Sequence, residues 1–320
     1  MNPSRAAVGM CFDRTFPPAA VLDFARRLDA GGADQLWIIE DCFYTAGPSL
    51  AAAALAVTDR LTLGLGILPA VARTAAVTAM EIATLSELSG GRVLPGIGHG
   101  IQSWMRQMGV QPASPLTALE EVITTVSRLL NGERVSFEGR TVHLEDVELD
   151  RPPSLVPPVL AGVRGPKSLA LAGRVAGGVV LAEPASPSFV RFALEQAAPT
   201  RPDFHIAVFS VLCVQADRRA AHRRMAPWLA KLIEDDTPEV RQLPFYGELV
   251  SWYRDRGQDG LIEIPTQWWQ ELGPIGTLED ALDHVAALEQ AGVHSIGLFP
   301  PPDLGFAREQ LGAVLQLASR

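Results

Sequence analysis

Short apolar runs alternate with longer amphipathic segments along most of this 320-residue chain. Eight of the runs have the character of strands: AVGMCF from Ala7, QLWIIED from Gln35, LTLGLGIL from Leu61, VLPGIG from Val93, PPVLAGV from Pro157, GGVVLAEP from Gly177, HIAVFSVLCV from His205 and HSIGLFPP from His294. Their apolar residues follow one another instead of alternating with polar ones, which is typical of strands covered on both faces. The pattern therefore predicts a parallel sheet with helices over its outer face.

Helical periodicity fills the intervals between these runs. We expect helices after the prolines at 17–18 and 48, over 74–89 and 116–130, from 166 onward, over 188–197, and over 218–256 in pieces broken at Pro227, Pro238 and Pro244. A final helix should begin at Thr277, with Asp280 completing its cap, and end at Gly292. Two tracts interrupt the rhythm: a polar, hairpin-like stretch over 133–149, and 257–276, which we expect to form irregular surface or a lid.

Eight strands separated by helices close naturally into a barrel. We therefore predict an α/β fold in which residues 1–320 form one (β/α)8 TIM-barrel domain, with insertions near 133–150 and 233–275. The alternative is an open doubly wound sheet. The first strand, however, runs into AVGMCFDRTFPP, which is not a G-x-G-x-x-G fingerprint.

Composition and charge exclude several classes of function. The formal net charge of -9, without a long run of lysine or arginine, argues against a nucleic-acid partner. No apolar run reaches the roughly 18 residues of a membrane span, and the N-terminus lacks a secretion signal, so we expect a cytoplasmic protein with no membrane partner. Cys11, Cys42 and Cys213 lie far apart in apolar runs, which indicates reduced, buried thiols. The six histidines show neither H-x-H nor H-E-x-x-H spacing, so we expect no metal site.

In a barrel of this kind the active site lies where the strands end. Glu40 and Asp41 follow the second strand, and because neighbours on a strand point to opposite faces, only one of the two should face the mouth. Such a carboxylate either caps a loop or pairs with an arginine, or it orients a ring nitrogen or carbonyl of a bound cofactor or substrate.

The fourth strand ends among glycines. Gly96, Gly98 and Gly100 surround His99, and so many glycines in a strand indicate that a ligand comes close to the backbone there. His99 is either a satisfied core histidine or a group that donates a hydrogen bond or moves a proton beside a flat ligand. We take Asp41, His99 and Glu40 as the candidate catalytic residues.

The turn after the fifth strand predicts an anion site. Gly162, Val163, Arg164 and Gly165 precede Pro166 at the first turn of a helix, so several backbone N–H groups there have no partner within the helix. Such amides, together with the helix dipole, hold phosphate groups. The alternative is an ordinary tight turn carrying surface cations.

Three stretches resemble the luciferase-like monooxygenase superfamily, namely TLSELSGGRVLPGIGHG, ALEEVITTVSRLLNGERVSFEGRTVHL and PPVLAGVRGPKSLALAGRVAGGVVL. The likeness covers roughly 31–181 and is greatest to the coenzyme F420-dependent branch that includes methylenetetrahydromethanopterin reductase. It implies a barrel with a flavin or deazaflavin at its mouth, a bulge after the third strand that often contains a non-prolyl cis peptide, and a phosphate near the fifth-strand turn. The cofactor-binding residues that it implies here are Gly66, Ile67, Gly98, Gly162, Val163, Arg164 and Gly165.

The chain departs from the sugar-phosphate dehydrogenases of that branch. Those enzymes carry an aspartate–histidine pair after the second strand and a glutamate after the fourth, where this chain has Glu40–Asp41 and Ile101. We therefore expect a different substrate pocket, walled by some of Phe43, Tyr44, Trp104, Trp268 and Trp269.

The resemblance implies an oxidoreductase that transfers a hydride between coenzyme F420 and a small organic substrate. Three alternatives stay open: a monooxygenase that uses FMN and oxygen, a barrel that binds a cofactor without turnover, and a metal-dependent hydrolase. Homodimers are common in the superfamily, and the apolar helix over 74–89 is the expected contact.

Overall fold

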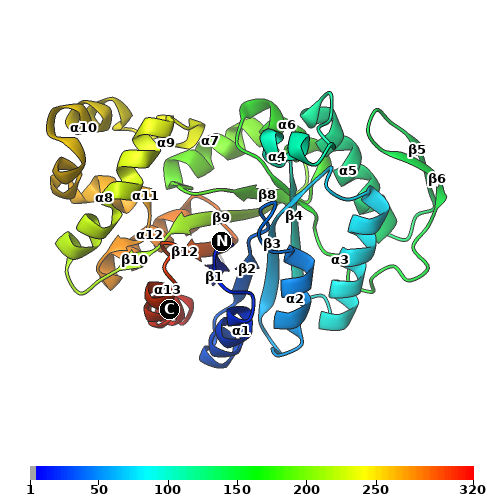
Figure 1. The fold of residues 1–320 in the computed structure, drawn as a ribbon, viewed down its shortest axis with the longest axis horizontal. Helices are drawn as coiled ribbons and strands as arrows, with labels where there is room; N and C mark the ends of the chain where they lie inside the picture. The colour runs from blue at the N-terminus through cyan, green and yellow to red at the C-terminus, as the bar shows by residue number, and fades with distance from the viewer. Residues whose placement is uncertain (1–4) are drawn as a thin grey trace.

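The computed structural model describes residues 5–320 and forms a closed barrel of parallel strands (Figure 1). In the order of their pairing around the barrel, the strands are β1 (Ala7–Phe12), β2 (Gln35–Ile38), β3 (Thr62–Pro69), β4 (Val93–Gly98), β7 (Leu160–Gly162), β8 (Gly178–Leu181), β9 (His205–Val211) and β12 (Ser295–Phe299). Since β1 pairs in parallel with both β2 and β12, the sheet has no free edge. The predicted (β/α)8 fold is confirmed, and the open sheet is excluded.

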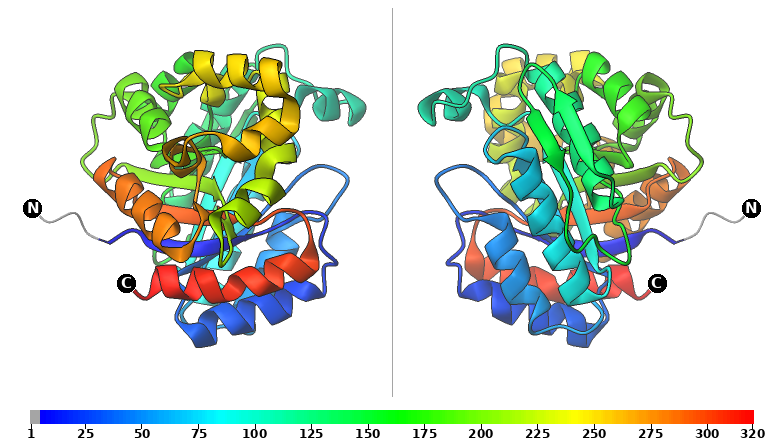
Figure 2. Two further views of the ribbon diagram at one scale, coloured as in Figure 1. Left: turned by 90° about the vertical axis from the view of Figure 1, so that its left-hand side faces the viewer. Right: turned by 90° about the vertical axis from the view of Figure 1, so that its right-hand side faces the viewer.

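Helices follow the barrel strands and cover their outer faces. They are α1 (Ala20–Gly31), α2 (Gly47–Leu55), α3 (Ala75–Ser89), α5 (Pro115–Leu130), α6 (Pro166–Val175), α7 (Pro187–Ala197), α12 (Leu278–Gln290) and α13 (Leu304–Ala318). Local signals fix several ends: Thr74 caps α3, and Thr277 with Asp280 forms the expected capping box of α12. Figure 2 shows α13 (red) against α1 (dark blue), so the last helix closes the ring beside the first.

Two additions extend from the barrel on opposite sides of the molecule (Figure 1). One is the antiparallel hairpin of β5 (Val135–Glu138) and β6 (His143–Val147), as predicted. The other comprises β10 (Cys213–Val214), α8 (Arg218–Asp235), α9 (Pro238–Arg241), α10 (Tyr246–Gly260), the 3-10 turn Leu261–Glu263, α11 (Thr266–Leu272) and β11 (Ile275–Gly276). Most of a second hydrophobic cluster lies in this addition and includes Leu229, Leu249 and Trp269.

Several predicted boundaries were wrong in this second addition. The tract 257–276 is largely helical, because Leu261, Trp269 and Leu272 bury an apolar face in the local cluster. Pro227 does not break α8, since its buried neighbours hold the helix in place on both sides. The run from His205 is split, with β9 in the barrel and β10 paired with β11 in a separate small sheet.

Two further helices lie outside the prediction. The helix that begins after Thr277 is not the final one, because α13 follows β12. A short helix, α4 (Gln102–Gln107), follows β4 directly. Neither was predicted, since α4 is too short to show a helical period and α13 begins just after a run of three prolines.

Large side chains fill the barrel interior. Trp37 and Phe209 meet edge to face, with ring centroids 5.2 Å apart. The Trp37 ring lies where Gly64 has no side chain, because a Cβ atom at Gly64 would come within 2.1 Å of it. This layer of the interior is therefore packed, and Phe209 of the same layer also lines the cavity described below.

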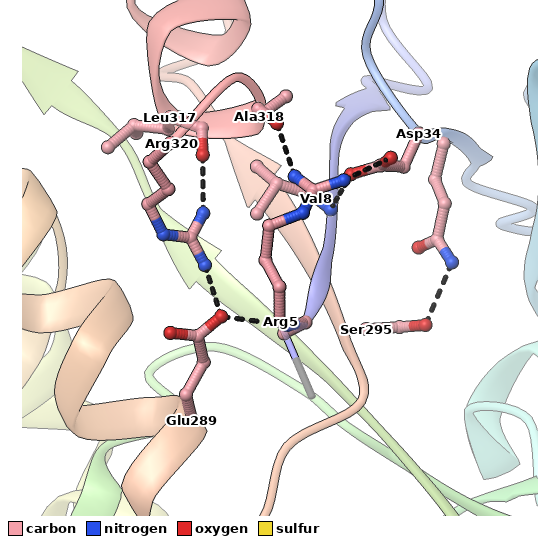
Figure 3. Close-up of polar contacts among 10 residues, drawn as sticks. Arg5, Val8, Asp34, Glu289, Ser295, Leu317, Ala318 and Arg320 are labelled. Atoms are coloured by element: carbon pink, nitrogen blue, oxygen red, sulfur yellow. Dashed lines mark hydrogen bonds and ion pairs between the residues drawn. The ribbon is translucent and has the colours of Figure 1, made fainter. Parts of the chain in front are cut away.

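The amino ends of the strands are held by a polar network (Figure 3). Asp34 accepts a hydrogen bond from the backbone N–H of Val8 at 2.8 Å and pairs with Arg5 at 2.8 Å. Glu289 of α12 accepts the N–H of Ala6 at 2.7 Å and also pairs with Arg320. These contacts link the segment at the start of β1 to the loop before β2 and to α12, which in turn is linked to the last residue of the chain.

Candidate functional site

A cavity of about 990 Å³ lies at the carboxyl ends of the barrel strands. Every barrel strand, or the loop after it, contributes to its wall, as the general rule for this architecture requires. The residues are Asp13 and Arg14, Ile39 to Cys42, Gly66, Ile67 and Pro69, His99 to Ile101, Gly162 to Gly165, Val180, Ala182 and Glu183, Phe209 and Val211, and Phe299 to Pro302. Trp104, Ser168 and four residues of α8 complete it.

Ile67 forms part of the cavity floor, and its side chain packs against glycine residues of the neighbouring strands. The Gly66–Ile67 peptide bond is cis, and the pairing of β3 with β4 shifts register between Leu65 and Leu68, so the bulge that the family resemblance implied is present. A Cβ atom on Gly98 would approach the Ile67 Cδ1 atom to 2.4 Å, and one on Gly162 would approach it to 2.5 Å. These two glycines make room for the Ile67 side chain.

This arrangement changes the interpretation of the fourth-strand glycines. Gly98 is buried and does not line the cavity. Gly96 also lies against Ile67, because a Cβ atom on Gly96 would approach the Ile67 Cγ2 atom to 2.8 Å. The ligand-sized space expected beside them is taken by that side chain. Any contact of Gly98 with a cofactor would therefore pass through Ile67.

The predicted anion turn is on the cavity wall. Gly162, Val163, Arg164 and Gly165 all line the cavity, and Gly165 is the N-cap of α6 with Pro166 in the first turn. No side chain caps this end of α6, and a Cβ atom at Gly165 would meet nothing within 4 Å. The backbone N–H groups of the first turn therefore adjoin open space, which favours an anion. Lys167 is exposed and does not line the cavity.

Glu40 and Asp41 both line the cavity, so the expectation that only one faces it was wrong. The strand β2 ends at Ile38, and the alternation of side chains no longer applies beyond it. Glu40 is buried and binds Arg73 through both oxygens, at 2.6 and 2.8 Å, while it accepts the N–H of Gly47 at 2.7 Å.

Asp41 is half-buried and pairs with Arg14, which also lines the cavity. Arg14 in turn lies over the ring of Tyr44, 5.0 Å from its centroid. Glu40 is thus committed to holding its loop through Arg73 and Gly47, whereas the Asp41–Arg14 pair stands in the wall itself.

His99 links two walls of the cavity. Its Nδ1 lies 3.1 Å from the carbonyl oxygen of Pro115, and its Nε2 lies 2.9 Å from the hydroxyl of Ser168 on α6. Because a carbonyl only accepts, Nδ1 carries the proton, and Nε2 of the neutral ring accepts from Ser168. Burial lowers the pKa of His99 below its usual value, and the Pro115 carbonyl only partly opposes this shift.

The aromatic residues expected around the pocket fall into two groups. Trp104 lines the cavity, while Phe43 and Tyr44 are exposed and do not, although Phe43 meets Trp104 edge to face with centroids 6.3 Å apart. Trp268 and Trp269 were wrongly predicted, because both pack in the cluster beneath α8 and α10.

Part of the wall had no signal in the sequence. Helix α8 presents Arg224, Met225, Trp228 and Lys231 to the cavity, and three of these recur at the i, i+4, i+7 spacing of one helix face. They lie within the helix after β9 and β10, not at the strand ends that the barrel rule selects. Ser168, by contrast, follows Pro166 at the predicted anion turn and could have been found there.

The cysteines are free, as predicted, but they do not share one environment. Cys11 and Cys213 are buried, whereas Cys42 is half-buried and lines the cavity, which corrects the prediction for that thiol. Burial raises the pKa of Cys42, which favours its protonated form. Among residues 5–320, no group of three or more histidine, cysteine, aspartate or glutamate side chains is placed to hold a metal ion. No helix in this described range is both long and apolar enough to cross a membrane.

Comparison with known proteins identifies the family. A family model described as luciferase-like monooxygenase matches residues 3–295. The 5,10-methylenetetrahydromethanopterin reductase of Methanolobus tindarius is 29% identical over 223 residues, which cover 68% of each chain. The F420-dependent glucose-6-phosphate dehydrogenase of Microbacterium testaceum is 32% identical over 179 residues, 52% of this chain and 53% of the relative.

A solved structure repeats the whole fold. The coenzyme F420-dependent tetrahydromethanopterin reductase from Methanopyrus kandleri superposes with a TM-score of 0.80 at 20% identity, over 99% of each chain. At that identity the likeness concerns the fold alone, whereas the family model spans most of the sequence. The chain therefore belongs to the luciferase-like monooxygenase family.

Proposed function

We propose that this protein is an oxidoreductase that transfers a hydride between coenzyme F420 and a small organic substrate. One observation carries the proposal: a single cavity joins the Gly66–Ile67 floor to the Gly162–Gly165 turn at the start of α6. A relative whose name specifies F420-dependent glucose-6-phosphate dehydrogenation supports the choice of cofactor, and one named as a methylenetetrahydromethanopterin reductase supports a redox reaction on a small organic substrate.

The residues present fit such a cofactor. A cavity of about 990 Å³ is at the upper end of the range for small-molecule sites, so it has room for a ring system, a tail and a second small molecule. Gly165 leaves the approach to the α6 amides open, as a phosphate group would need. When bound, the cofactor supplies the ring that donates or accepts hydride, and the protein supplies position and charge.

The cofactor-binding residues divide by what they offer. Gly66 and Ile67 provide an apolar floor for a flat ring, with Gly98 supporting Ile67 from below. The backbone of Gly162, Val163 and Gly165 and the guanidinium of Arg164 provide the anion site. Binding at both places fixes the ring face that meets the substrate.

The candidate catalytic residues take different roles. Asp41 and His99 line the cavity and are proposed to handle the proton or to touch the substrate. The lowered pKa of His99 keeps its imidazole neutral near pH 7, so its Nε2 is an acceptor, with Ser168 as the neighbouring hydroxyl. Glu40 acts as a positioning residue, because its oxygens are engaged by Arg73 and Gly47.

A titration tests the cofactor assignment. Purified protein is titrated with F420 and, separately, with FMN, and binding is followed by absorbance and fluorescence. We expect submicromolar binding of F420, weakened by roughly tenfold in Arg164→Ala, the loss typical of one charge-assisted contact. Lys167→Ala is the matched control, because Lys167 is a cation of the same turn that lies outside the cavity wall.

Other outcomes would redirect the proposal. Binding of FMN alone would favour the monooxygenase chemistry named in the family description. Binding of F420 without turnover of any substrate in a broad screen would favour a carrier of the cofactor. Binding of neither would overturn the proposal.

We also propose that the protein works as a homodimer joined at α3. Val77, Met80 and Leu88 lie along one exposed face of that helix, and Met80 and Leu88 are 55% and 72% exposed. Leu155 is also exposed, and its carbonyl accepts a 2.8 Å hydrogen bond from Ser86, so this apolar side chain lies close to α3. Large apolar side chains exposed along one helix favour burial against a second copy.

A further inference from the structure

The outer wall of the cavity is built for apolar contact. We use "outer wall" for Ile101, Trp104, Met225, Trp228 and the prolines 300–302, all of which line the cavity without belonging to the barrel-interior cluster. They come from the end of β4, from α4, from α8 and from the loop after β12. Two tryptophans from different elements therefore face one space, and each offers a large flat surface at little entropic cost.

The charges around this space are already balanced within the protein. Arg14 pairs with Asp41, and Lys231 pairs with Asp235. Arg224 lies 3.8 Å from Asp303 and covers the ring of Phe306, 3.6 Å from its centroid.

Arg164 is the other cation on the wall among the described residues, and it too has a partner within the protein. It belongs to the turn that the proposed function assigns to the cofactor's phosphate. Of the acids on the wall, Asp13 accepts two hydrogen bonds from Thr15, Glu40 is engaged by Arg73, and Glu183 also has a partner within the protein.

These observations bear on the substrate. An ionic substrate would lose its hydration on entering an apolar wall and would have to displace an existing ion pair to regain a partner. A neutral molecule pays neither cost and gains contact with both tryptophans. This reasoning rests on the proposed function, because it leaves the Gly162–Gly165 turn to the cofactor.

We propose that the substrate is a neutral, predominantly apolar molecule that carries a ring, and that Trp104 and Trp228 are its specificity-determining residues. The ring packs against the two indoles, and the reacting group faces the floor at Ile67. A phosphorylated or carboxylated substrate is excluded by the same wall.

Binding of three matched probes tests the substrate class without requiring turnover. The probes are acetophenone, 4-acetylbenzoate and 4-acetylphenyltrimethylammonium, which share one ring and one carbonyl and differ in charge. Calorimetry is carried out on the purified protein, alone and saturated with whichever cofactor binds. We expect the neutral probe to bind roughly tenfold or more tightly than either charged analogue, because only it avoids an unpaired buried charge.

Variants of the wall test the specificity residues. Trp104→Ala and Trp228→Ala should each weaken the neutral probe by roughly tenfold and leave cofactor affinity unchanged. The matched control is Trp268→Ala, since Trp268 is a half-buried tryptophan near α8 that stacks on Phe245 at 4.6 Å and lies outside the cavity. Melting temperatures of all three variants show whether a loss of binding reflects a loss of fold.

The outcomes separate this inference from the proposed function. Equal or tighter binding of a charged probe, or an unchanged affinity in both tryptophan variants, would overturn the inference even if F420 binds. Selective binding of the neutral probe by a protein that binds no cofactor would leave the inference standing and overturn the proposed function.

Discussion

The side chain of Ile67 fills the space that Gly162 leaves by having no side chain of its own. A Cβ atom on Gly162 would lie 2.5 Å from Cδ1 and 2.8 Å from Cγ2 of Ile67, and no other residue is as near. The cavity floor therefore depends on a pair of residues from β3 and β7, in which the large side chain of Ile67 is accommodated by the missing side chain of Gly162.

Gly162→Ala should destabilise the protein by about 1–3 kcal/mol through overpacking. The cost should largely vanish in the Ile67→Ala background, because the clashing atoms are then gone, although Ile67→Ala has its own cavity cost. Urea unfolding of the four proteins of the double-mutant cycle measures the coupling. Additive effects would show that the clash is absorbed elsewhere.

Glu40→Gln should destabilise the protein by about 2 kcal/mol, because it removes a charge from a buried, two-pronged pair with Arg73. The loss is moderated by Glu81, which lies 2.9 Å from the same guanidinium. In an Arg73→Met background the effect of Glu40→Gln should be much smaller. Equal effects in both backgrounds would assign the stabilisation to the Gly47 N–H contact alone.

Stability should fall in mild acid because of His284. This residue is 1% exposed, and burial lowers the pKa of its imidazole to about 4, against a usual value near 6.5. Since the unfolded chain binds the proton more readily, the contribution to stability is complete above about pH 6.5 and is lost progressively as the pH falls towards 4. The total is on the order of 3 kcal/mol.

Chemical denaturation at a series of pH values from 7 to 4 checks this prediction. His284→Gln should have a shallower slope than the parent across that window, whatever its absolute stability. His143→Gln, at an exposed histidine of the hairpin, serves as the control and should keep the parent's slope. Identical slopes in all three proteins would rule out His284 as the source.

Met80→Glu and Leu88→Glu should convert the proposed dimer into monomers, since each places a charge in the apolar face of α3. Sedimentation velocity over a concentration series measures the change. Arg26→Glu, an exposed charge change on α1, should leave the assembly intact. A parent protein that sediments as a monomer would refute the dimer directly.

The barrel was predictable because its signals are local and repeated. Continuous apolar strands, the Thr277–Asp280 cap and the glycine ends of α1 and α3 each specify an element without reference to the rest. The helices of 257–276 were not predictable from the sequence, because the tertiary contacts of Trp269 and Leu261 make that tract helical.

The site divides in the same way. Residues at strand ends, such as Asp41 and His99, follow from the barrel rule and do line the cavity. Met225 and Trp228 could not be found, because nothing in α8 indicates which of its faces turns towards the strand ends. The glycines of β4 correctly indicated that a group lies close to the strand backbone, but that group is the side chain of Ile67 and not a ligand. The sequence shows that space is needed beside a glycine but does not show which group fills it.

The network of Arg5, Asp34, Glu289 and Arg320 has a consequence for how this scaffold can change. It supports the closure of the barrel at the end remote from the cavity, and none of its four residues lines the cavity. Sequence changes at the mouth of the barrel should therefore leave the closure of the barrel intact. Hybrids in which mouth segments are exchanged between homologues should fold and should have new substrate preferences.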